Sequence, residues 1–526
     1  MQNNQTGGKS SLKLTNFRQK LGISNLKINI IANFVGRFWV AIMSLAFVPI
    51  YIKILGVESY GLIGIYGSLQ AIFSLLDMGL GVAISKEISS LIVQEGKAQQ
   101  LRNLVKTVES IYWGLSVFIA IAISVSSPLL AHYWINQKGL QEATVQQALI
   151  LIGLLIATQF SFNFYSGGIL ALQHQVLFNL INIVMATLRG VGVIAVLWLT
   201  SPTIQVFFAW QLLISLLQTL LCGRIFWQSL PLTSEKAQFK KKLLAGIQHF
   251  AIGMFGIAIL GLLLTQIDKI LLSKILTLED FGYYSLANMV ASNLIMLISP
   301  IIVAVSPQFA QLVSKREEKA LAYLYHRSCQ LLAVVVLPVA TILALFAPEI
   351  LTVWLGNPVT VKNTSLLVSL LVTGTAIHCL IHLPHSLMVA YNWTSLTFYQ
   401  NLIAVIILIP ALFWITNQYG SVGAALVWIV LNLCYVLIGN QIMHARILQT
   451  EKMKWYYQDV GLPWLGALAV ALPARFLLPS QLSLTLTIGS VGFISILTLS
   501  GSCWFTPLTR NLIKNRILSK IFTKQS

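Results

Sequence analysis

Charged side chains are scarce in this sequence of 526 residues. Only 9% of the residues are Asp, Glu, Lys or Arg, whereas 57% are hydrophobic. A soluble domain carries about 25% charged residues, so this chain could not cover a globular surface with polar groups. The scarcity of charge excludes a soluble globular protein and indicates an integral membrane protein.

Cysteine and long polar segments are scarce as well. The five cysteines lie in or beside apolar segments without paired spacing, as expected for small hydrophobic residues rather than for a disulfide or metal framework. The longest polar stretches are residues 1–27 and the loops near 85–107, 227–245 and 308–327. None is large enough to be a domain, so the function must reside in the membrane helices, and no cofactor or metal is expected.

Long apolar runs fill the rest of the chain. Each is long enough to cross about 30 Å of hydrocarbon, and none alternates with a period of two, as barrel strands do. The sequence therefore predicts an all-α integral membrane protein with about fourteen transmembrane helices. The predicted spans are 28–52, 60–84, 108–131, 147–171, 176–199, 204–226, 246–272, 282–307, 328–348, 365–389, 396–416, 421–442, 461–478 and 483–505.

The positive charges are distributed unequally between the two sides of these spans. Of the 34 Lys and Arg residues, 26 lie on the side of the N-terminus, five lie on the opposite side and three lie inside spans. By the positive-inside rule both termini are cytoplasmic, in a plasma (inner) membrane. The net charge of +19 then reflects topology and contact with anionic lipid, so we expect no nucleic-acid partner.

An internal repeat divides the spans into two halves. Lys53-Ile-Leu-Gly-Val-Glu-Ser-Tyr-Gly61 and Lys274-Ile-Leu-Thr-Leu-Glu-Asp-Phe-Gly282 share five of nine positions at an offset of 221. Six spans separate the copies, so the repeat is parallel, as in many transporters. The predicted parts are a basic cytoplasmic tail (1–27), two six-helix lobes (28–226 and 246–442) joined by a cytoplasmic loop (227–245), a C-terminal hairpin (461–505) and a second basic cytoplasmic tail (506–526).

Several motifs resemble those of one transporter family. They are Asn33-Phe-Val-Gly-Arg37, Pro49-Ile-Tyr-Ile-Lys-Ile-Leu-Gly56, Leu76-Asp77-Met-Gly79, Asp268-Lys-Ile-Leu-Leu272, Gly282-Tyr-Tyr-Ser285 and Trp354-Leu-Gly356. The joint pattern, over nearly the whole chain, resembles the polysaccharide-biosynthesis (O-antigen-type) flippases of the multidrug/oligosaccharidyl-lipid/polysaccharide exporter superfamily.

The resemblance implies a flippase rather than an enzyme. Such a protein moves a polyprenyl-pyrophosphate-linked oligosaccharide from the cytoplasmic to the outer leaflet by alternating access, around a cationic cavity lined by the first two helices of each lobe. A polysaccharide polymerase and export machinery are the partners it implies, and the hairpin 461–505 is expected to flank the portal for the polyprenyl tail or to support a lobe. The alternatives are a drug or metabolite:cation antiporter of the same superfamily and a membrane polysaccharide polymerase or ligase.

Three basic residues are candidates for binding the substrate. Arg37 lies about 14 Å deep in the first span, too far to reach the interface easily, and its fork suits a diphosphate. Arg189 lies near the middle of its span, where pairing inside the lobe is the alternative role. His249 lies at the inner end of its span, where it either attracts phosphate or is a plain interfacial histidine.

Two carboxylates are candidates for ion coupling or charge pairing. Asp77 either orients Arg37 or binds a cation, and Asp268 is expected to face the bundle while the neighbouring Lys269 points outward. His378, His382 and His385 share one helix face. No acidic residue lies near them in the sequence, which favours a polar stripe along a wet crevice over a metal site.

Overall fold

The computed structural model describes residues 32–33, 35–77, 80–92, 94–479 and 482–510, and in these ranges the regular structure is entirely helical. The predicted tail 1–27 and most of the predicted tail 506–526 lie outside them. A helical chain suits a membrane, because hydrocarbon offers no partner to backbone N–H and C=O groups and a helix pairs them within one segment.

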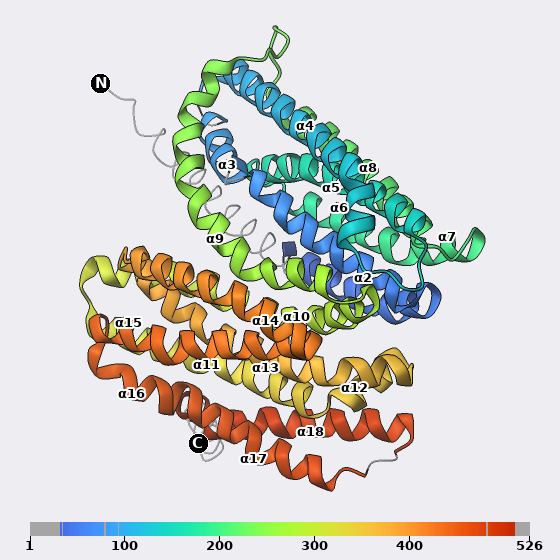
Figure 1. Ribbon diagram of the computed structural model, residues 1–526. Helices are drawn as coiled ribbons and strands as arrows, with labels where there is room; N and C mark the ends of the chain where they lie inside the picture. Colours follow the sequence, from blue (N-terminus) through green and yellow to red (C-terminus); the bar gives the residue numbers. More distant parts are fainter. Residues whose placement is uncertain (1–31, 34, 78–79, 93, 480–481, 511–526) are drawn as a thin grey trace, which may run out of the picture. The chain divides into compact units, whose positions relative to one another are not determined.

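The helix Val35–Ala46 is followed by the helices that Figure 1 labels. They are α2 (Val48–Ser74), α3 (Leu80–Leu91), α4 (Ala98–Leu129), α5 (Glu142–Ala171), α6 (Gln175–Thr187), α7 (Val193–Leu199), α8 (Ile204–Ser229), α9 (Ala245–Ile275), α10 (Leu278–Lys315), α11 (Glu318–Leu345), α12 (Ala347–Leu355), α13 (Pro358–Ala390), α14 (Thr394–Cys434), α15 (Asn440–Arg446), α16 (Lys452–Lys454), α17 (Leu462–Leu477) and α18 (Leu484–Phe505). Short 3-10 or π turns connect them as η1 (Leu75–Asp77), η2 (Leu130–Trp134), η3 (Leu188–Gly192), η4 (Lys241–Leu244), η5 (Tyr435–Gly439), η6 (Gln449–Glu451) and η7 (Trp455–Gly461).

Eleven helices of the described residues are long and apolar enough to cross a membrane. One of them, Thr394–Arg446, has 53 residues, about 80 Å at 1.5 Å per residue and far more than one crossing needs. Gly420 divides it with φ +60° and ψ −145°, a conformation that glycine adopts at little cost. Gly56, with φ +81°, divides α2 in the same way. Both glycines lie in short loops that the sequence predicts between spans.

Helices also occupy two stretches that the hydropathy of the sequence assigns to loops. α3 runs into the predicted loop near 85–107, where Ile84, Ile88 and Leu91 are buried on one face. The helical segment of the C-terminal hairpin begins at Gln449 rather than at residue 461. Averaging hydropathy over a whole span hides a helix that is apolar on one face only.

The contacts divide the chain into two compact units. Unit 1 consists of Met1–Gly56, Leu69–Tyr133 and Gln141–Ala258, and unit 2 of Val57–Ser68, Trp134–Leu140 and Ile259–Ser526. The division falls within α9 and transfers two short segments of the first half to unit 2. The lobe limits predicted from the repeat therefore stay a prediction, and each unit is described by itself.

In unit 1, α5 packs against both α4 and α8. The core between them is aromatic: Tyr112 stacks on Phe160, with ring centroids 5.1 Å apart, and Phe164 meets Phe226 edge to face at 5.7 Å. A Cβ on Gly168 would lie 2.5 Å from the ring of Phe226. Glycine is needed there because small residues let membrane helices approach closely.

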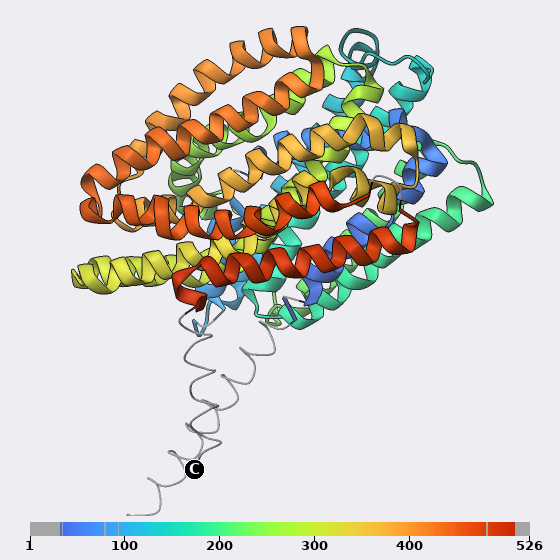
Figure 2. The same ribbon diagram turned by 90° about the horizontal axis from the view of Figure 1, so that it is seen from below.

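In unit 2, α13 packs against α10, α11 and α14. The hairpin helices α17 and α18 lie side by side and along α11 (Figures 1 and 2). A Cβ on Gly466 or on Gly501 would lie 2.6 Å from the carbonyl oxygen of the other residue. The pairing of the hairpin therefore depends on two glycines, one on each helix.

Polar contacts attach both ends of the hairpin segment to the rest of unit 2. His326 of α11 lies between Asp459 of η7 (Nδ1–Oδ2 2.5 Å) and Glu451 of η6 (Nε2–Oε2 2.9 Å), and Asp459 is fully buried. The two ring nitrogens of His326 thus contact one carboxyl group each and link η6 and η7 to α11. At the far end of α17, Arg475 pairs with Glu349 of α12.

We predict that His326→Ala loosens the hairpin, because it leaves the buried Asp459 with only the hydrogen bond from Gln330. Breaking a buried pair on one side costs about 3–5 kcal/mol, so the unfolding temperature of the purified protein should fall clearly. His132→Ala is the matched control, since its pair with Glu142 is exposed (59% and 50%) and such pairs contribute about 0–1 kcal/mol. Equal unfolding temperatures for the two variants would contradict this role of His326.

Candidate functional site

Arg37 lies on an exposed face of the helix Val35–Ala46. The same helix packs on α6 through the residues beside it. Asn179 donates to Asn33 (Nδ2–Oδ1 2.6 Å), and a Cβ on Gly36 would lie 2.4 Å from the amide oxygen of Asn179. The backbone next to Arg37 is therefore held firmly, while its guanidinium points away from the core of unit 1 and is available to an anionic ligand.

Arg189 is tied into unit 1 at the π turn η3. Its Nη2 donates to the amide oxygen of Gln218 on α8 at 2.7 Å, and Gln218 in turn donates to Asn182 at 2.8 Å. Trp210 donates to the carbonyl of Leu188 at 3.0 Å, so α8 also supplies a donor to a backbone oxygen of the turn. These contacts favour the structural role for Arg189.

Asp77 closes the turn η1 and contacts the helices α4 and α3. The hydroxyl of Tyr112 on α4 donates to its Oδ1. A Cβ on Gly81 would lie 3.0 Å from its Oδ2, so the carboxylate also lies against the first turn of α3. Neither contact is with Arg37, the partner that the sequence suggests as one alternative.

Asp268 of α9 lies beside α10 in unit 2. The hydroxyl of Tyr284 donates to its Oδ2 at 2.8 Å. Among the described residues, its Oδ1 is buried without a hydrogen-bond partner. Lys269 bonds instead to the carbonyl of Thr265 and to Gln266, both at 3.3 Å. A half-satisfied carboxyl in hydrocarbon is costly when ionised, which makes Asp268 a candidate for binding a proton or a cation.

The residues selected from the sequence differ in their contacts. In unit 1, Arg189 donates to Gln218 of α8 and Asp77 accepts from Tyr112 of α4, and in unit 2 Asp268 accepts from Tyr284 of α10. His249 falls within α9, but its side chain lies outside the described residues. The five candidates therefore keep separate roles, and their part in binding stays a prediction.

The three histidines of α13 line a cavity of about 320 Å³ in unit 2. His378 contacts Asn432 of α14 (Nδ1–Oδ1 2.9 Å), and its ring lies 5.4 Å from that of Trp428. His382 contacts the carbonyl of His378 at 3.1 Å. We call this space the histidine cavity; its lining is completed by Gly261, Leu264, Thr265, Ile381, His385, Met388, Thr397, Gln400, Asn401, Leu431 and Tyr435.

The histidine cavity offers neutral donors and acceptors rather than carboxylates. Its polar groups are imidazoles, amides and hydroxyls, and no Asp or Glu is among the described lining residues. In the described part of the chain, no three His, Cys, Asp or Glu side chains are placed to hold a metal. Imidazole and amide N–H groups with an aromatic ring suit hydroxyl-rich or phosphate-bearing ligands.

A second polar cavity of about 630 Å³ adjoins the first through His385. It lies between the C-terminal parts of α10 and α13 and is lined by Ser306, Ala310, Val313, Ser314, Ser386, Val389, Ala390 and Asn392. By the predicted topology these helix ends are cytoplasmic. The shared histidine makes the two spaces consecutive along α13.

The sequence reveals only one wall of the histidine cavity. The helical spacing of the histidines is visible, but Gln400, Asn401 and Asn432 stand alone in apolar spans. An uncharged amide inside a predicted span is the signal that could have selected them, because such a group needs a partner in hydrocarbon. Which amides face the histidines depends on how α14 folds back at Gly420, and the hydropathy of the sequence does not predict that geometry.

The two copies of the repeat meet within unit 2, where α2 crosses α10. A Cβ on Gly61 would lie 2.3 Å from the carbonyl oxygen of Leu278, and a Cβ on Gly282 would lie 2.4 Å from that of Val57. The two contacts are equivalent, since both residues of each pair are exchanged by the repeat offset of 221. We call this the glycine crossing; backbones this close exclude any side chain at either glycine.

Known proteins resemble this chain in sequence. Residues 51–360, more than half of the chain, match a family described as "Polysaccharide biosynthesis protein". The chain is 24% identical over 448 residues to the succinoglycan biosynthesis transport protein ExoT of Rhizobium meliloti (strain 1021), with 82% of each chain covered. It is 22% identical over 391 residues to the "Putative O-antigen transporter" of Shigella flexneri, covering 74% of this chain and 90% of that one.

Solved structures include a similar helical fold. The lipid II flippase MurJ, in an inward closed conformation, superposes with a TM-score of 0.65 at 16% identity, covering 92% of this chain and 99% of that one. At this identity the likeness shows the fold alone.

We predict that cysteines placed in the glycine crossing form a cross-link. An ideal Cβ at Gly64 lies 2.8 Å from the Cβ of Ser285, so a small shift brings Gly64→Cys and Ser285→Cys to the Cβ separation of about 3.8 Å that a disulfide needs. Oxidation in membranes should give a product that migrates differently until it is reduced. Gly67→Cys with Ser285→Cys is the control, because the space at Gly67 is open to 4 Å. Equal yields for both pairs would show that α2 and α10 do not cross there.

Proposed function

The chain belongs to the family of polysaccharide biosynthesis proteins, and we propose that it is a flippase for polyprenyl-diphosphate-linked oligosaccharide, moving it from the cytoplasmic to the outer leaflet. The observation that carries the proposal is the family match over residues 51–360. The names of two relatives, a succinoglycan biosynthesis transport protein and a candidate O-antigen transporter, point to the same class of cargo. In this proposal the chain transports its cargo and catalyses no reaction.

The proposed architecture has fourteen crossings. Two six-helix lobes (28–226 and 246–442) alternate in access, and the hairpin 461–505 is appended to the second. The glycine crossing supports this arrangement, because it joins equivalent positions of the two repeat copies as a parallel repeat would. Both termini are cytoplasmic in this proposal, as the distribution of Lys and Arg predicts.

The cargo requires polar groups inside the membrane. The headgroup carries sugar hydroxyls and a diphosphate, and both must leave water during transport. The histidine cavity supplies donors for these oxygens within otherwise apolar helices, and Arg37 supplies an exposed fork that suits a diphosphate. Arg189 has a smaller part in the proposal, since Gln218 already accepts from it. His249 keeps its proposed place at the inner mouth.

The membrane potential is a sufficient driving force for the proposed direction. A headgroup with a charge of about −2 that moves outward gains about 2.3 kcal/mol per charge for every 100 mV of inside-negative potential. Asp268 is the residue that would add coupling to an ion, because its Oδ1 is buried without a partner among the described residues. No ATP-binding motif is needed in this scheme.

A drug or metabolite:cation antiporter is the second candidate, and Asp268 is the observation that favours it. Cationic cargo needs carboxylates in the transport path, but the described linings of the two polar cavities contain none. Asp77 is engaged by Tyr112. A polymerase or ligase has less support, because both curated relatives are named as transport proteins or transporters.

The proposal is tested in cells that lack the protein. Lipid-linked oligosaccharide should then accumulate in the cytoplasmic leaflet, where a glycosidase added to the outside of spheroplasts cannot cleave it. Expression of the full chain should restore cleavage. If the oligosaccharide is equally accessible with and without the chain, the flippase proposal is wrong.

Arg37 gives a more specific prediction. Arg37→Ala should reduce polysaccharide export by at least about tenfold at unchanged membrane abundance, as for the loss of a charge-assisted contact of about 1.5–3 kcal/mol. Arg37→Lys should restore export only in part, because lysine keeps the charge and loses the fork. Lys236→Ala, which removes a charge from the predicted cytoplasmic loop, is the control. Normal export by Arg37→Ala would remove Arg37 from the substrate path.

A further inference from the structure

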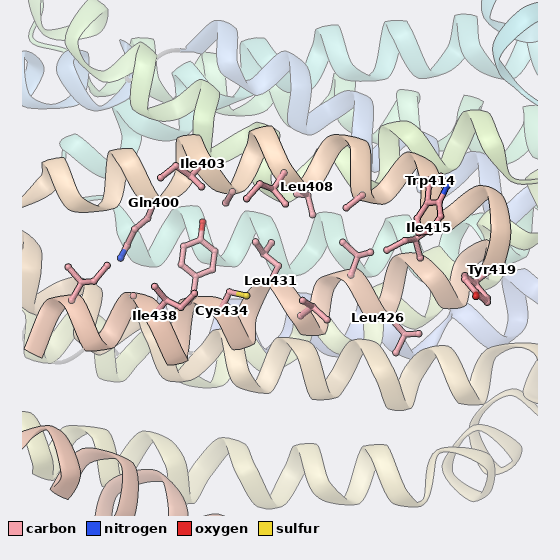
Figure 3. A pocket seen from close by; sticks show the side chains of 18 residues that line it. Gln400, Ile403, Leu408, Trp414, Ile415, Tyr419, Leu426, Leu431, Cys434 and Ile438 are labelled. Atoms are coloured by element: carbon pink, nitrogen blue, oxygen red, sulfur yellow. The ribbon is translucent and has the colours of Figure 1, made fainter.

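A long apolar groove runs between the two arms of α14. The chain reverses at Gly420, so Thr394–Tyr419 forms one arm, and the rest of α14 continues through η5 and α15 to form the other. The groove between them has a volume of about 620 Å³. Figure 3 shows side chains of both arms, among them Leu408 and Leu431, directed into it.

The lining of the groove follows one stripe on each arm. On the first arm, Gln400, Ala404, Leu408, Ala411 and Ile415 recur at helical spacing. From the first to the last of these residues the groove extends about 22 Å at 1.5 Å per residue, most of the hydrocarbon thickness. The two alanines leave the space that a larger side chain would fill. The second arm contributes Leu426, Val430, Cys434 and Ile438, among others.

The groove is open along its length and has a polar end. Ile407, Val430 and Ile438 at its rim are exposed by 63%, 58% and 59%, which on membrane helices means contact with lipid. At the end away from the Gly420 turn lies Gln400 (Figure 3), and Tyr435 also lines the groove. A hydrocarbon chain can therefore enter from the side. Trp414 and Tyr419 line the groove near the turn, so the far end differs from it by its contact with the histidine cavity.

That polar end is shared with the histidine cavity. Gln400, Leu431 and Tyr435 line both spaces. The hydroxyl of Tyr435 donates to Asn401 at 2.9 Å, on the cavity side. The polar histidine cavity thus continues directly into the apolar groove. The two spaces together match a molecule with a polar head and one long hydrocarbon tail.

We propose that the groove holds the polyprenyl tail of the lipid-linked substrate while the headgroup occupies the histidine cavity, an assignment that rests on the proposed function. A single channel between two helices accepts one chain, which is what a polyprenyl carrier has and a two-chain phospholipid does not. The hairpin helices α17 and α18, by contrast, pack on α11. They are tethered by the contact of His326 on α11 with Asp459 and by the pair of Arg475 with Glu349. The hairpin therefore supports the lobe, and the tail follows α14.

The test measures binding of two probes to the purified full-length protein in phospholipid nanodiscs. Undecaprenyl diphosphate and geranyl diphosphate share a headgroup and differ in the length of the tail. The tail of the long probe moves from lipid into the groove, so the free energy gained there comes from packing rather than from leaving water. We therefore expect the long probe to bind only about five- to tenfold more tightly than the short one. Ala411→Trp should abolish that preference and leave the affinity for the short probe unchanged.

Two further variants control for the fold and for bulk. Ala404→Trp fills the groove one turn from Gln400 and should also remove the preference for the long probe. Ile406→Trp adds the same ring to the same arm at a residue that is 62% exposed and does not line the groove, so it should keep the preference of the wild type.

The outcomes separate this inference from the proposed function. If the wild type binds both probes equally, or if the groove variants keep the preference for the long probe, the groove does not hold the tail while the flippase proposal stands. If neither probe binds, recognition of the diphosphate head fails, and the proposed function fails with it. If photoreactive phosphatidylglycerol labels the groove and undecaprenyl diphosphate does not compete, the occupant is membrane lipid and the inference is wrong.

Discussion

The close approach of α2 and α10 at Gly61 and Gly282 is the constraint on which the rest of unit 2 depends. Each glycine lies against a backbone carbonyl of the other repeat copy, at positions where a Cβ would be only 2.3–2.4 Å from the oxygen. The turn at Gly56 (φ +81°) frees the following part of α2 to enter this crossing. Because the contact is between backbones, a side chain at Gly61 or Gly282 is poorly tolerated. The two helices are therefore either in close contact or separated, with no stable arrangement between. That is the property expected of an element with two discrete arrangements, as alternating access requires.

The cost of ionised groups in hydrocarbon explains how the remaining polar residues are arranged. Asp77 and Asp268 each accept from a tyrosine, and Arg189 donates to Gln218. Neutral partners let such residues stay within the membrane without a buried ion pair, whose desolvation is expensive. The histidine cavity brings together several uncharged polar side chains, and Arg37 remains exposed. The histidine cavity and Arg37 are therefore the places where we expect a polar cargo to find hydrogen-bond partners in place of water.

The sequence predicts much of the fold because hydropathy and glycine are local signals. It locates the apolar helices and the turns at Gly56 and Gly420, and it detects the repeat whose two copies meet in the glycine crossing. It misses α3, since a helix that is buried on one face only has an ordinary mean hydropathy. It also misses the contact of His326 with Asp459, 133 residues away, and the partner of Asp77, because hydrogen bonds between distant helices leave no periodic trace. For the candidate site, the histidine stripe is predictable and the amides that face it are not. Their facing depends on the packing of α14 on α13.

Transport by the purified protein tests the central claim most directly. Lipid-linked oligosaccharide labelled in its sugar would be placed in vesicles with the full-length protein, and the share cleaved by an external glycosidase would be followed with time. The account predicts rapid loss of the protected inner-leaflet pool in vesicles with the wild type. Vesicles with the Gly64→Cys, Ser285→Cys variant should show that loss only after the cross-link is reduced, because the proposed alternating access requires α2 and α10 to separate at the glycine crossing. If folded, correctly inserted wild-type protein leaves the inner pool as large as in protein-free vesicles, the flippase proposal is wrong.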